Sequence, residues 1–170
     1  MVTTQQKILI SCSNAKSLLR FRGKLIEELL KNNIVYVFTP TIENPKLRDT
    51  LNQMGVKVHE NTLNGNTISV TSDLKYLMAL ARVIHKVKPD VFFAYTFKPL
   101  IYGSIVASLF NVKTKVAMLT GLGYNFADKQ KNLAKTVTQK LLKFSLGFNK
   151  NLKIVFLSGL QLYLPHLSNN

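Results

Sequence analysis

The feature that most constrains this chain is a regular alternation of short apolar runs with longer segments that read as helices. The runs have the length of β-strands, and they lie at residues 7–12, 34–39, 56–59, 91–95, 115–119 and 152–157. The segments between them favour helices, and they cover residues 16–31, 44–54, 72–88, 99–110 and 129–148. Strands and helices that alternate in this way are typical of a parallel sheet covered on both faces. We therefore expect a single α/β domain with a Rossmann-like, doubly wound parallel sheet.

The helix predictions rest on boundary residues and on apolar faces. The first helix carries Leu18, Leu25 and Leu29 on one face. The second has Pro45 in its first turn and Gly55 after its end. For the third helix we expect Ser72 as the N-cap, and an inner face made of Leu74, Leu77, Met78, Ala81 and Ile84.

Composition places the chain among folded proteins of the cytoplasm. Its 170 residues are enough for one well-buried domain, and 46% of them are hydrophobic against 18% charged. The single cysteine, Cys12, cannot form an internal disulfide, and no signal peptide is recognisable. The longest uncharged apolar stretch, residues 99–112, is too short to span a bilayer.

The formal charge of +15 points to anionic partners. Nucleic acid, anionic lipid and other phosphate ligands all fit such a charge, but no known nucleic-acid-binding motif occurs, so we expect no nucleic acid. Beyond Asn111 the only acidic residue is Asp128. The segment 129–148 is either an ordinary sheet-covering helix or a contact with the cytoplasmic leaflet of the membrane, made through Lys131, Lys135 and Lys143.

Two polar stretches directly follow predicted strands and mark the expected site. Tyr95-Thr-Phe-Lys-Pro closes one strand, and Thr120-Gly-Leu-Gly-Tyr124 follows the next. Ligands of open parallel sheets bind beyond the carboxyl ends of the strands, at the point where the strand order reverses. With the usual order 3-2-1-4-5-6, the loops at 11–15, 95–98 and 120–124 would share one crevice.

The common cofactor and metal signatures are absent. The turn at residues 11–16 contains no glycine, so it is neither a dinucleotide fingerprint nor a P-loop. Phe126 stands where a third glycine would complete the pattern that Gly121 and Gly123 begin. The three histidines have no ligand spacing, and no catalytic triad is recognisable. We therefore expect neither a cofactor nor a metal.

Two basic residues have competing interpretations. Arg22 lies in the apolar stripe of the first helix, where a buried guanidinium needs a partner. That partner is either an acidic side chain in a structural ion pair, with Asp90 as a candidate, or an anion held near the crevice. Lys98 directly precedes Pro99, where backbone N–H groups at a helix start would favour phosphate; the alternative is a solvated loop lysine.

Several motifs of this chain occur together in a familiar order. They are Asn14, the stretch Ser17-Leu-Leu-Arg-Phe-Arg-Gly-Lys-Leu, Lys88-Pro-Asp, Tyr95-Thr-Phe-Lys-Pro-Leu-Ile-Tyr-Gly-Ser and Thr120-Gly-Leu-Gly-Tyr-Asn-Phe. Together and in this order they resemble the N-terminal half of family 4 glycosyltransferases. The resemblance covers residues 7–156. It is strongest to the capsule, O-antigen and glycan-assembly enzymes that extend a polyprenyl-diphosphate-linked sugar.

The resemblance implies half of a GT-B fold, in which two Rossmann-like domains face a cleft. The N-terminal domain would receive a polyprenyl-diphosphate glycan acceptor, and a missing or separately encoded C-terminal domain would bind the nucleotide-sugar donor. The chain would then divide into a disordered start at 1–6, the domain at 7–157 and an atypical or truncated tail at 158–170. We expect it to be inactive alone, and peripheral at the inner face of the cell membrane.

The resemblance places no catalytic residue in this chain, but it implies a set of acceptor-binding residues. In this set the glycines alone could simply shape a turn, and the tyrosines could form walls. The set is Asn14, Arg22, Thr96, Lys98, Tyr102, Thr120, Gly121, Gly123 and Tyr124. Two other functions stay open: a noncatalytic subunit that anchors a split glycosyltransferase to the membrane, and a basic nucleic-acid-binding module.

Overall fold

The computed structural model describes residues 5–62, 70–96, 98–119, 140, 147 and 151–156. Its strands are β1 (Gln6–Ser11), β2 (Asn33–Pro40), β3 (Lys57–Asn61), β4 (Val91–Tyr95), β5 (Thr114–Leu119) and β6 (Leu152–Phe156). Its helices are α1 (Lys16–Leu30), α2 (Pro45–Gln53), α3 (Val70–Val87), the π-helical turn η1 (Pro99–Gly103) and α4 (Ser104–Leu109). Most boundaries lie within two residues of the expected ones, which is the usual uncertainty at helix and strand ends.

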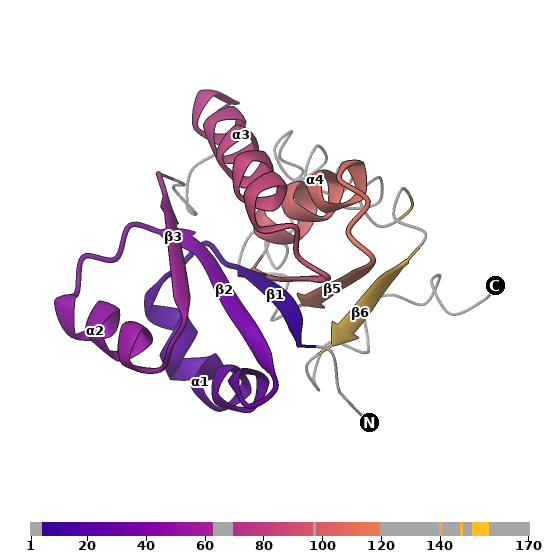
Figure 1. Cartoon of the computed structure of the whole chain (residues 1–170). Helices are drawn as coiled ribbons and strands as arrows, with labels where there is room; N and C mark the ends of the chain where they lie inside the picture. Colours follow the sequence, from indigo (N-terminus) through magenta and orange to yellow (C-terminus); the bar gives the residue numbers. More distant parts are fainter. Residues whose placement is uncertain are drawn as a thin grey trace.

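The six strands form one parallel sheet in the order β3-β2-β1-β4-β5-β6. This is the expected order, and it makes β1 the strand at which the chain changes direction across the sheet (Figure 1). Ser11 at the end of β1 pairs with Phe38 of β2 on one side and with Ala94 of β4 on the other. The loops after β1 and β4 therefore leave the sheet side by side, at its carboxyl edge.

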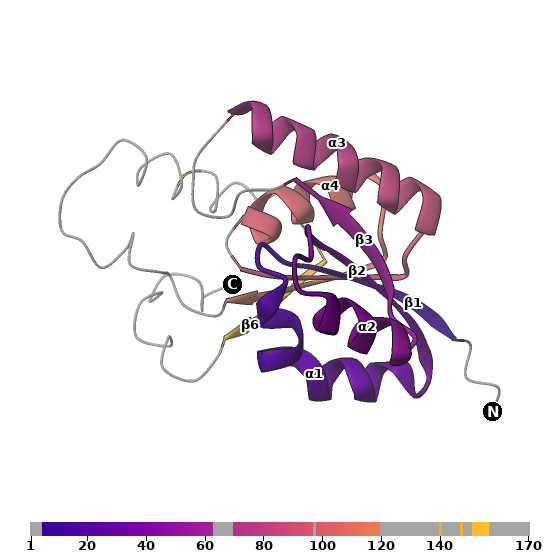
Figure 2. The same ribbon diagram turned by 90° about the vertical axis from the view of Figure 1, so that its left-hand side faces the viewer.

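Helices cover both faces of the sheet, so the central strands are buried on both sides. Figure 2 shows α1 and α2 against one face and α3 and α4 against the other. Successive side chains of a strand point to opposite faces. Leu9 of β1 accordingly packs in the core beneath α3 and α4, whereas Ile8 and Ile10 pack in the core beneath α1 and α2. The continuous apolar run of β1 follows from this double burial.

Helix α3 differs from its sequence-based description in both its start and its orientation. It includes Ser72, which is therefore inside the first turn and is not the N-cap. Leu74 and Met78, expected to face inward, are 54% and 43% exposed. Of the other expected residues, Ile84 is buried, and Leu77 and Ala81 pack partly buried against the same core. The buried residues of α3 are Asp73, Tyr76, Leu80, Ile84 and Val87. Apolar side chains occur around most of this helix, so periodicity alone did not decide which of them meet the sheet.

The helix expected at 99–110 begins with the π-helical turn η1 and continues as α4. Gly103, where the two join, lies against the sheet so closely that an added Cβ would come within 2.5 Å of the Phe92 ring. The helix expected at 129–148 lies outside the described residues except at positions 140 and 147. Within the described ranges, no helix is both long and apolar enough to cross a membrane.

Candidate functional site

The carboxyl edge of the sheet brings together the loop after β1 and the turn after β4. The Ser13 backbone N–H donates to Thr96 Oγ1 at 3.0 Å, and the Ser13 hydroxyl donates to the same atom at 2.9 Å. Thr96 lies 83 residues further along the chain, so this contact depends on the parallel pairing of β1 with β4. The structure thus joins the two loops that were expected to share a crevice.

Thr96 has a backbone conformation that β-branched residues rarely adopt. Its φ is +69°, in the left-handed region, where only glycine is free of strain. Its carbonyl accepts the Leu100 N–H at 3.1 Å, which starts the helical segment that follows. Residues held in such conformations cluster at functional sites, because the surrounding structure must hold them there.

Lys98 is neither a solvated loop lysine nor an unpaired phosphate ligand. Its Nζ lies 2.8 Å from Asp73 Oδ1, and the two side chains are 11% and 9% exposed. The second carboxylate oxygen, Oδ2, accepts the Tyr102 hydroxyl at 3.0 Å. Burial and the Asp73 carboxylate together raise the pKa of Tyr102 to about 12. The Lys98–Asp73 ion pair and the protonated Tyr102 phenol therefore form a hydrogen-bonded cluster without net charge, which connects α3 to the segment after β4.

Asp73 is the residue of this cluster that sequence reasoning missed. It is the only acidic residue of α3, and it stands in the first turn of that helix. A carboxylate in a first turn is ordinarily explained by the helix dipole, so the pattern carried no signal of a specific partner. Its pairing with Lys98, 25 residues away, requires the α3 start and the β4 end to meet at the same sheet edge.

Arg22 also reaches this edge, but the ion pair with Asp90, one of the two interpretations considered for it, does not form. The guanidinium carbon of Arg22 lies 5.3 Å from the centre of the Tyr95 ring, and Nη1 donates to the Phe21 carbonyl. Its Nε is buried and has no hydrogen-bond partner among the described residues. Asp90 precedes β4 at the opposite edge of the sheet, where it accepts the Lys7 N–H at 3.0 Å. The Arg22 side chain is thus held by a cation–π contact.

Asn14 shapes the start of α1. Its Oδ1 accepts the Lys16 N–H at 2.9 Å, and its carbonyl accepts the Ser17 hydroxyl at 2.6 Å. Because Ser17 donates its only hydrogen to Asn14, the Tyr95 hydroxyl must be the donor in its 3.0 Å contact with Ser17. Burial raises the pKa of Tyr95, which keeps that hydroxyl protonated. Arg22 therefore contacts the Tyr95 side chain directly, and Asn14 is linked to it through Ser17.

A second layer of buried polar side chains supports these loops from below. Ser11 bonds the Tyr76 hydroxyl at 3.0 Å, and the Cys12 thiol donates to Thr39 Oγ1 at 3.4 Å. Burial raises the pKa of both Tyr76 and Cys12. These groups are enclosed, so they position the loops and are not exposed to a ligand.

The remaining predicted site residues, Thr120, Gly121, Gly123 and Tyr124, lie outside the described residues. The strand that precedes them, β5, pairs with β4 in parallel, so it ends at the same edge of the sheet as Tyr95. Of the predicted set, the structure therefore brings Asn14, Arg22 and Thr96 to one edge, together with Lys98 and Tyr102, which both bond to Asp73. Among the residues it describes, no group of three His, Cys, Asp or Glu side chains could hold a metal ion.

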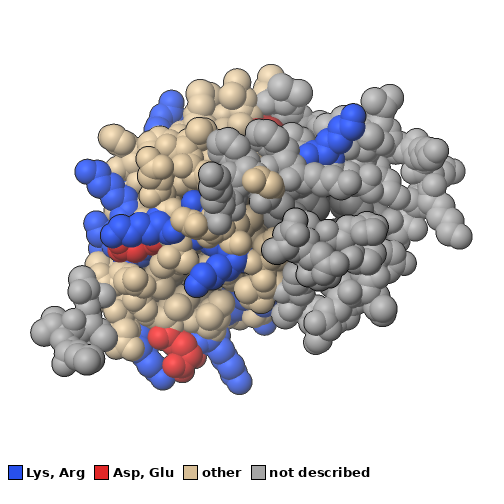
Figure 3. All heavy atoms as spheres, turned by 90° about the vertical axis from the view of Figure 1, so that its right-hand side faces the viewer, with Lys and Arg blue, Asp and Glu red and all other residues tan. Residues whose placement is uncertain are grey.

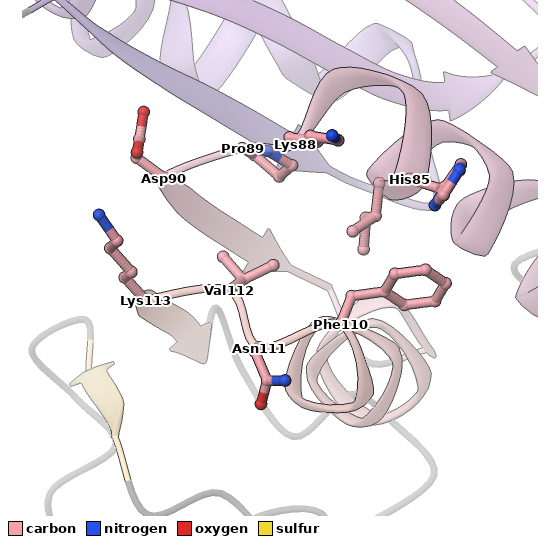
Figure 4. A pocket seen from close by; sticks show the side chains of 9 residues that line it. His85, Lys88, Pro89, Asp90, Phe110, Asn111, Val112 and Lys113 are labelled. Atoms are coloured by element: carbon pink, nitrogen blue, oxygen red, sulfur yellow. The ribbon is translucent and has the colours of Figure 1, made fainter.

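Two surface hollows lie away from this edge. One, of about 320 Å³, is formed where α3 ends and where β4 and β5 begin, and Figure 4 shows His85, Lys88 and Phe110 around it. The other, of about 440 Å³, is lined by Tyr36, His59 and Lys86. Neither includes a predicted site residue, and both flank the C-terminal end of α3. The candidate site is the carboxyl edge of the sheet, where hydroxyl and amide groups, the Arg22 guanidinium and the Lys98–Asp73 ion pair gather. Hydroxyl, amide and guanidinium groups suit phosphate and sugar oxygens.

The chain is similar to known proteins in both sequence and fold. The profile of the glycosyl transferase 4-like family matches residues 7–156. No curated protein sequence shows significant similarity to the chain. Among solved structures, a UDP-N-acetylglucosamine 2-epimerase superposes with a TM-score of 0.56 at 16% identity, covering 88% of this chain and 47% of the epimerase.

Two further solved structures have a similar fold. The calicheamicin glycosyltransferase CalG4 gives a TM-score of 0.51 at 16% identity over 81% of this chain and 37% of CalG4. HepE from Anabaena, solved with UDP and glucose, gives 0.52 at 17% identity over 89% of this chain and 44% of HepE. The chain thus spans less than half the length of these proteins, and at such identities the likeness concerns the fold alone. From the match over residues 7–156 and the parallel six-stranded sheet, the chain belongs to the glycosyl transferase 4-like family and has the fold of an N-terminal GT-B-type domain.

Proposed function

We propose that this domain, residues 7–157, forms the acceptor-binding side of a glycosyltransferase that transfers a sugar from a nucleotide donor to a polyprenyl-diphosphate-linked glycan. The observation that carries the proposal is the convergence of Asn14, Thr96 and the Lys98 cluster at the switch point of a sheet from this family. Ligands of such sheets bind at that point. Hydroxyl and N–H groups that donate hydrogen bonds gather there near the Arg22 guanidinium, as a diphosphate requires, while Asp73 balances the charge of Lys98.

The donor nucleotide sugar would be bound by a C-terminal domain, in the same polypeptide or supplied separately. That domain would provide the groups that stabilise the leaving diphosphate, and electrostatic stabilisation of this kind usually accelerates a reaction more than any other single effect. We therefore expect the 170-residue chain, incubated alone with labelled nucleotide sugars and polyprenyl-diphosphate acceptors, to give no product. Product above background would contradict the assignment of donor binding to a separate C-terminal domain.

Binding of the acceptor tests the proposed site directly. Affinity for a short-chain polyprenyl-diphosphate sugar is measured for the wild type and for Lys98→Gln, which keeps a donor but removes the charge. Loss of the charged hydrogen bond should weaken binding by about 1.5–3 kcal/mol. Lys75→Gln is the control, because Lys75 is exposed on α3. Equal affinity of the two variants would show that the diphosphate lies elsewhere.

We also propose that the protein is peripheral at an anionic membrane. The support is its charge of +15 and the lysines at 131, 135 and 143, which lie outside the described residues. On the face seen in Figure 3, basic side chains are spread over the described surface, with few acidic ones. Each lysine near an anionic bilayer contributes about 1 kcal/mol, screened by salt. Flotation with phosphatidylglycerol vesicles should fall steeply with salt; if charge reversal at all three lysines leaves flotation unchanged, that segment does not contact the membrane.

A further inference from the structure

The hydrogen bonds of Thr96 determine where its own hydroxyl hydrogen can point. A threonine hydroxyl has one hydrogen to donate and two lone pairs that accept. Both lone pairs of Thr96 Oγ1 are occupied, one by the Ser13 N–H at 3.0 Å and the other by the Ser13 hydroxyl at 2.9 Å. The hydrogen of Thr96 is therefore directed away from Ser13. Within the described ranges, no residue accepts it.

The backbone around Thr96 keeps this donor in a fixed place. The residue is held at φ +69°, and its carbonyl is bonded to the Leu100 N–H at 3.1 Å. Ser13 is fixed in turn by the loop that runs from β1 into α1, where Asn14 bonds Lys16 and Ser17. A left-handed conformation at a β-branched residue is costly, and such cost is characteristic of functional sites. Ser13 and Thr96 are both partly exposed, so a ligand at the carboxyl edge of the sheet can reach them.

We infer that the Thr96 hydroxyl is a directed hydrogen-bond donor to a phosphate oxygen of the acceptor diphosphate, and that Ser13 is the positioning residue that sets its direction. This inference rests on the proposed function. Because both lone pairs of the Thr96 hydroxyl are already occupied, it can only donate a hydrogen bond. Such a group suits an oxygen that carries no hydrogen, and a phosphate oxygen is such an acceptor. Lys98, two residues further on, belongs to the same turn, and its charge is paired there with the Asp73 carboxylate.

The test uses inorganic pyrophosphate as the probe and calorimetric titration of the 170-residue chain. Thr96→Val keeps the branched shape but removes the donor, and it should weaken binding by on the order of tenfold to a hundredfold, the value of a hydrogen bond to a charged group. Thr96→Ser keeps the hydroxyl and should bind within a few-fold of the wild type. Thr50→Val is the matched control, because the Thr50 hydroxyl bonds Lys46 on the exposed helix α2.

Ser13→Ala tests the positioning role separately. It leaves the Thr96 hydroxyl in place but frees one of its lone pairs, so the affinity for pyrophosphate should fall, and Ser13→Thr should restore it. A purely structural role would lower the unfolding temperature in Ser13→Ala without changing the affinity of the folded protein. Amide hydrogen exchange adds a direct readout: the Ser13 N–H should lose its protection in Thr96→Val and keep it in Thr96→Ser.

The possible outcomes separate this inference from the proposed function. If the wild type does not bind pyrophosphate, the diphosphate subsite itself is wrong, and the role of Thr96 falls with it. If the wild type binds and Thr96→Val binds as tightly as Thr50→Val, only the present inference is overturned. If Thr96→Val does not fold, the comparison of Thr96→Ser with Ser13→Ala decides, and equal affinities of these two would refute the inference.

Discussion

Replacement of Lys98 by methionine should destabilise the fold far more than loss of an ordinary surface lysine. Lys98 and Asp73 are about nine-tenths buried, and their charged atoms are 2.8 Å apart. Removing one partner of a fully buried ion pair costs about 3–5 kcal/mol, because the other charge is left without a counterion. Asp73 keeps the hydrogen bond from Tyr102 and some contact with water. We therefore expect Lys98→Met to lower the free energy of unfolding by about 3 kcal/mol.

Urea unfolding followed by circular dichroism measures this change, and thermal unfolding gives an independent value. For a chain of this size a loss of about 3 kcal/mol corresponds to a fall of roughly 6–12 °C in the melting temperature. The control is Lys31→Met, because the Lys31–Glu28 pair is exposed by 63% and 67%. That variant should change the free energy of unfolding by less than about 0.5 kcal/mol.

A double variant tests the physical cause. If the destabilisation comes from an uncompensated carboxylate, Asp73→Asn combined with Lys98→Met should recover at least half of the loss. A Lys98→Met variant that loses less than about 1 kcal/mol, or a double variant less stable than both single ones, would refute the reasoning. The first result would mean that Asp73 is solvated in the native protein.

Three further predictions concern the core. Gly103→Ala should lower stability by about 1–3 kcal/mol, because the new Cβ would meet the Phe92 ring at 2.5 Å, whereas Gly23→Ala, with nothing within 4 Å, should be neutral or stabilising in urea unfolding. Cys12 is fully buried with a raised pKa, so a thiol reagent at pH 8 should label the native protein far more slowly than the urea-unfolded chain; equal rates would contradict its burial. Burial also raises the Tyr102 pKa to about 12, so the native state favours the protonated phenol. The contribution of Tyr102 to stability should therefore be constant below about pH 10 and be lost as pH rises toward 12, in the same direction as those of Tyr76 and Tyr95, whose pKa values burial also raises. A melting temperature that does not fall between about pH 10 and pH 12 would exclude the effect.

Much of the fold could be predicted from local patterns. The apolar runs ending at Cys12, Tyr95 and Leu119 identified strands, and their alternation with helices implied parallel pairing. The strand order assumed from the usual pattern of such sheets is the observed one. Because the carboxyl ends of parallel strands share one edge, the same reasoning placed Asn14, Thr96 and Lys98 near a common site. These conclusions needed only the period of the side chains and the residues that end each element.

The partners of the site residues could not be predicted in this way. Periodicity shows that α3 is largely apolar but not that Tyr76 and Asp73, in place of Leu74 and Met78, turn toward the sheet. That orientation is chosen by packing, since Tyr76 fits against Phe38 with ring centres 5.4 Å apart and bonds Ser11. It also carries Asp73 to Lys98. Similarly, Arg22 lies over Tyr95 and not beside Asp90, because Asp90 lies at the opposite end of β4.

The sequence by itself therefore determined the order of strands and helices and the edge of the sheet at which polar residues gather, since both depend on short-range periodicity. Only the tertiary structure decided which of those polar groups are already engaged with one another. The Ser13–Thr96 and Asp73–Lys98 contacts join residues 83 and 25 positions apart. Such contacts depend on how each helix is rotated against the sheet, and that rotation is set by the packing of large side chains between them.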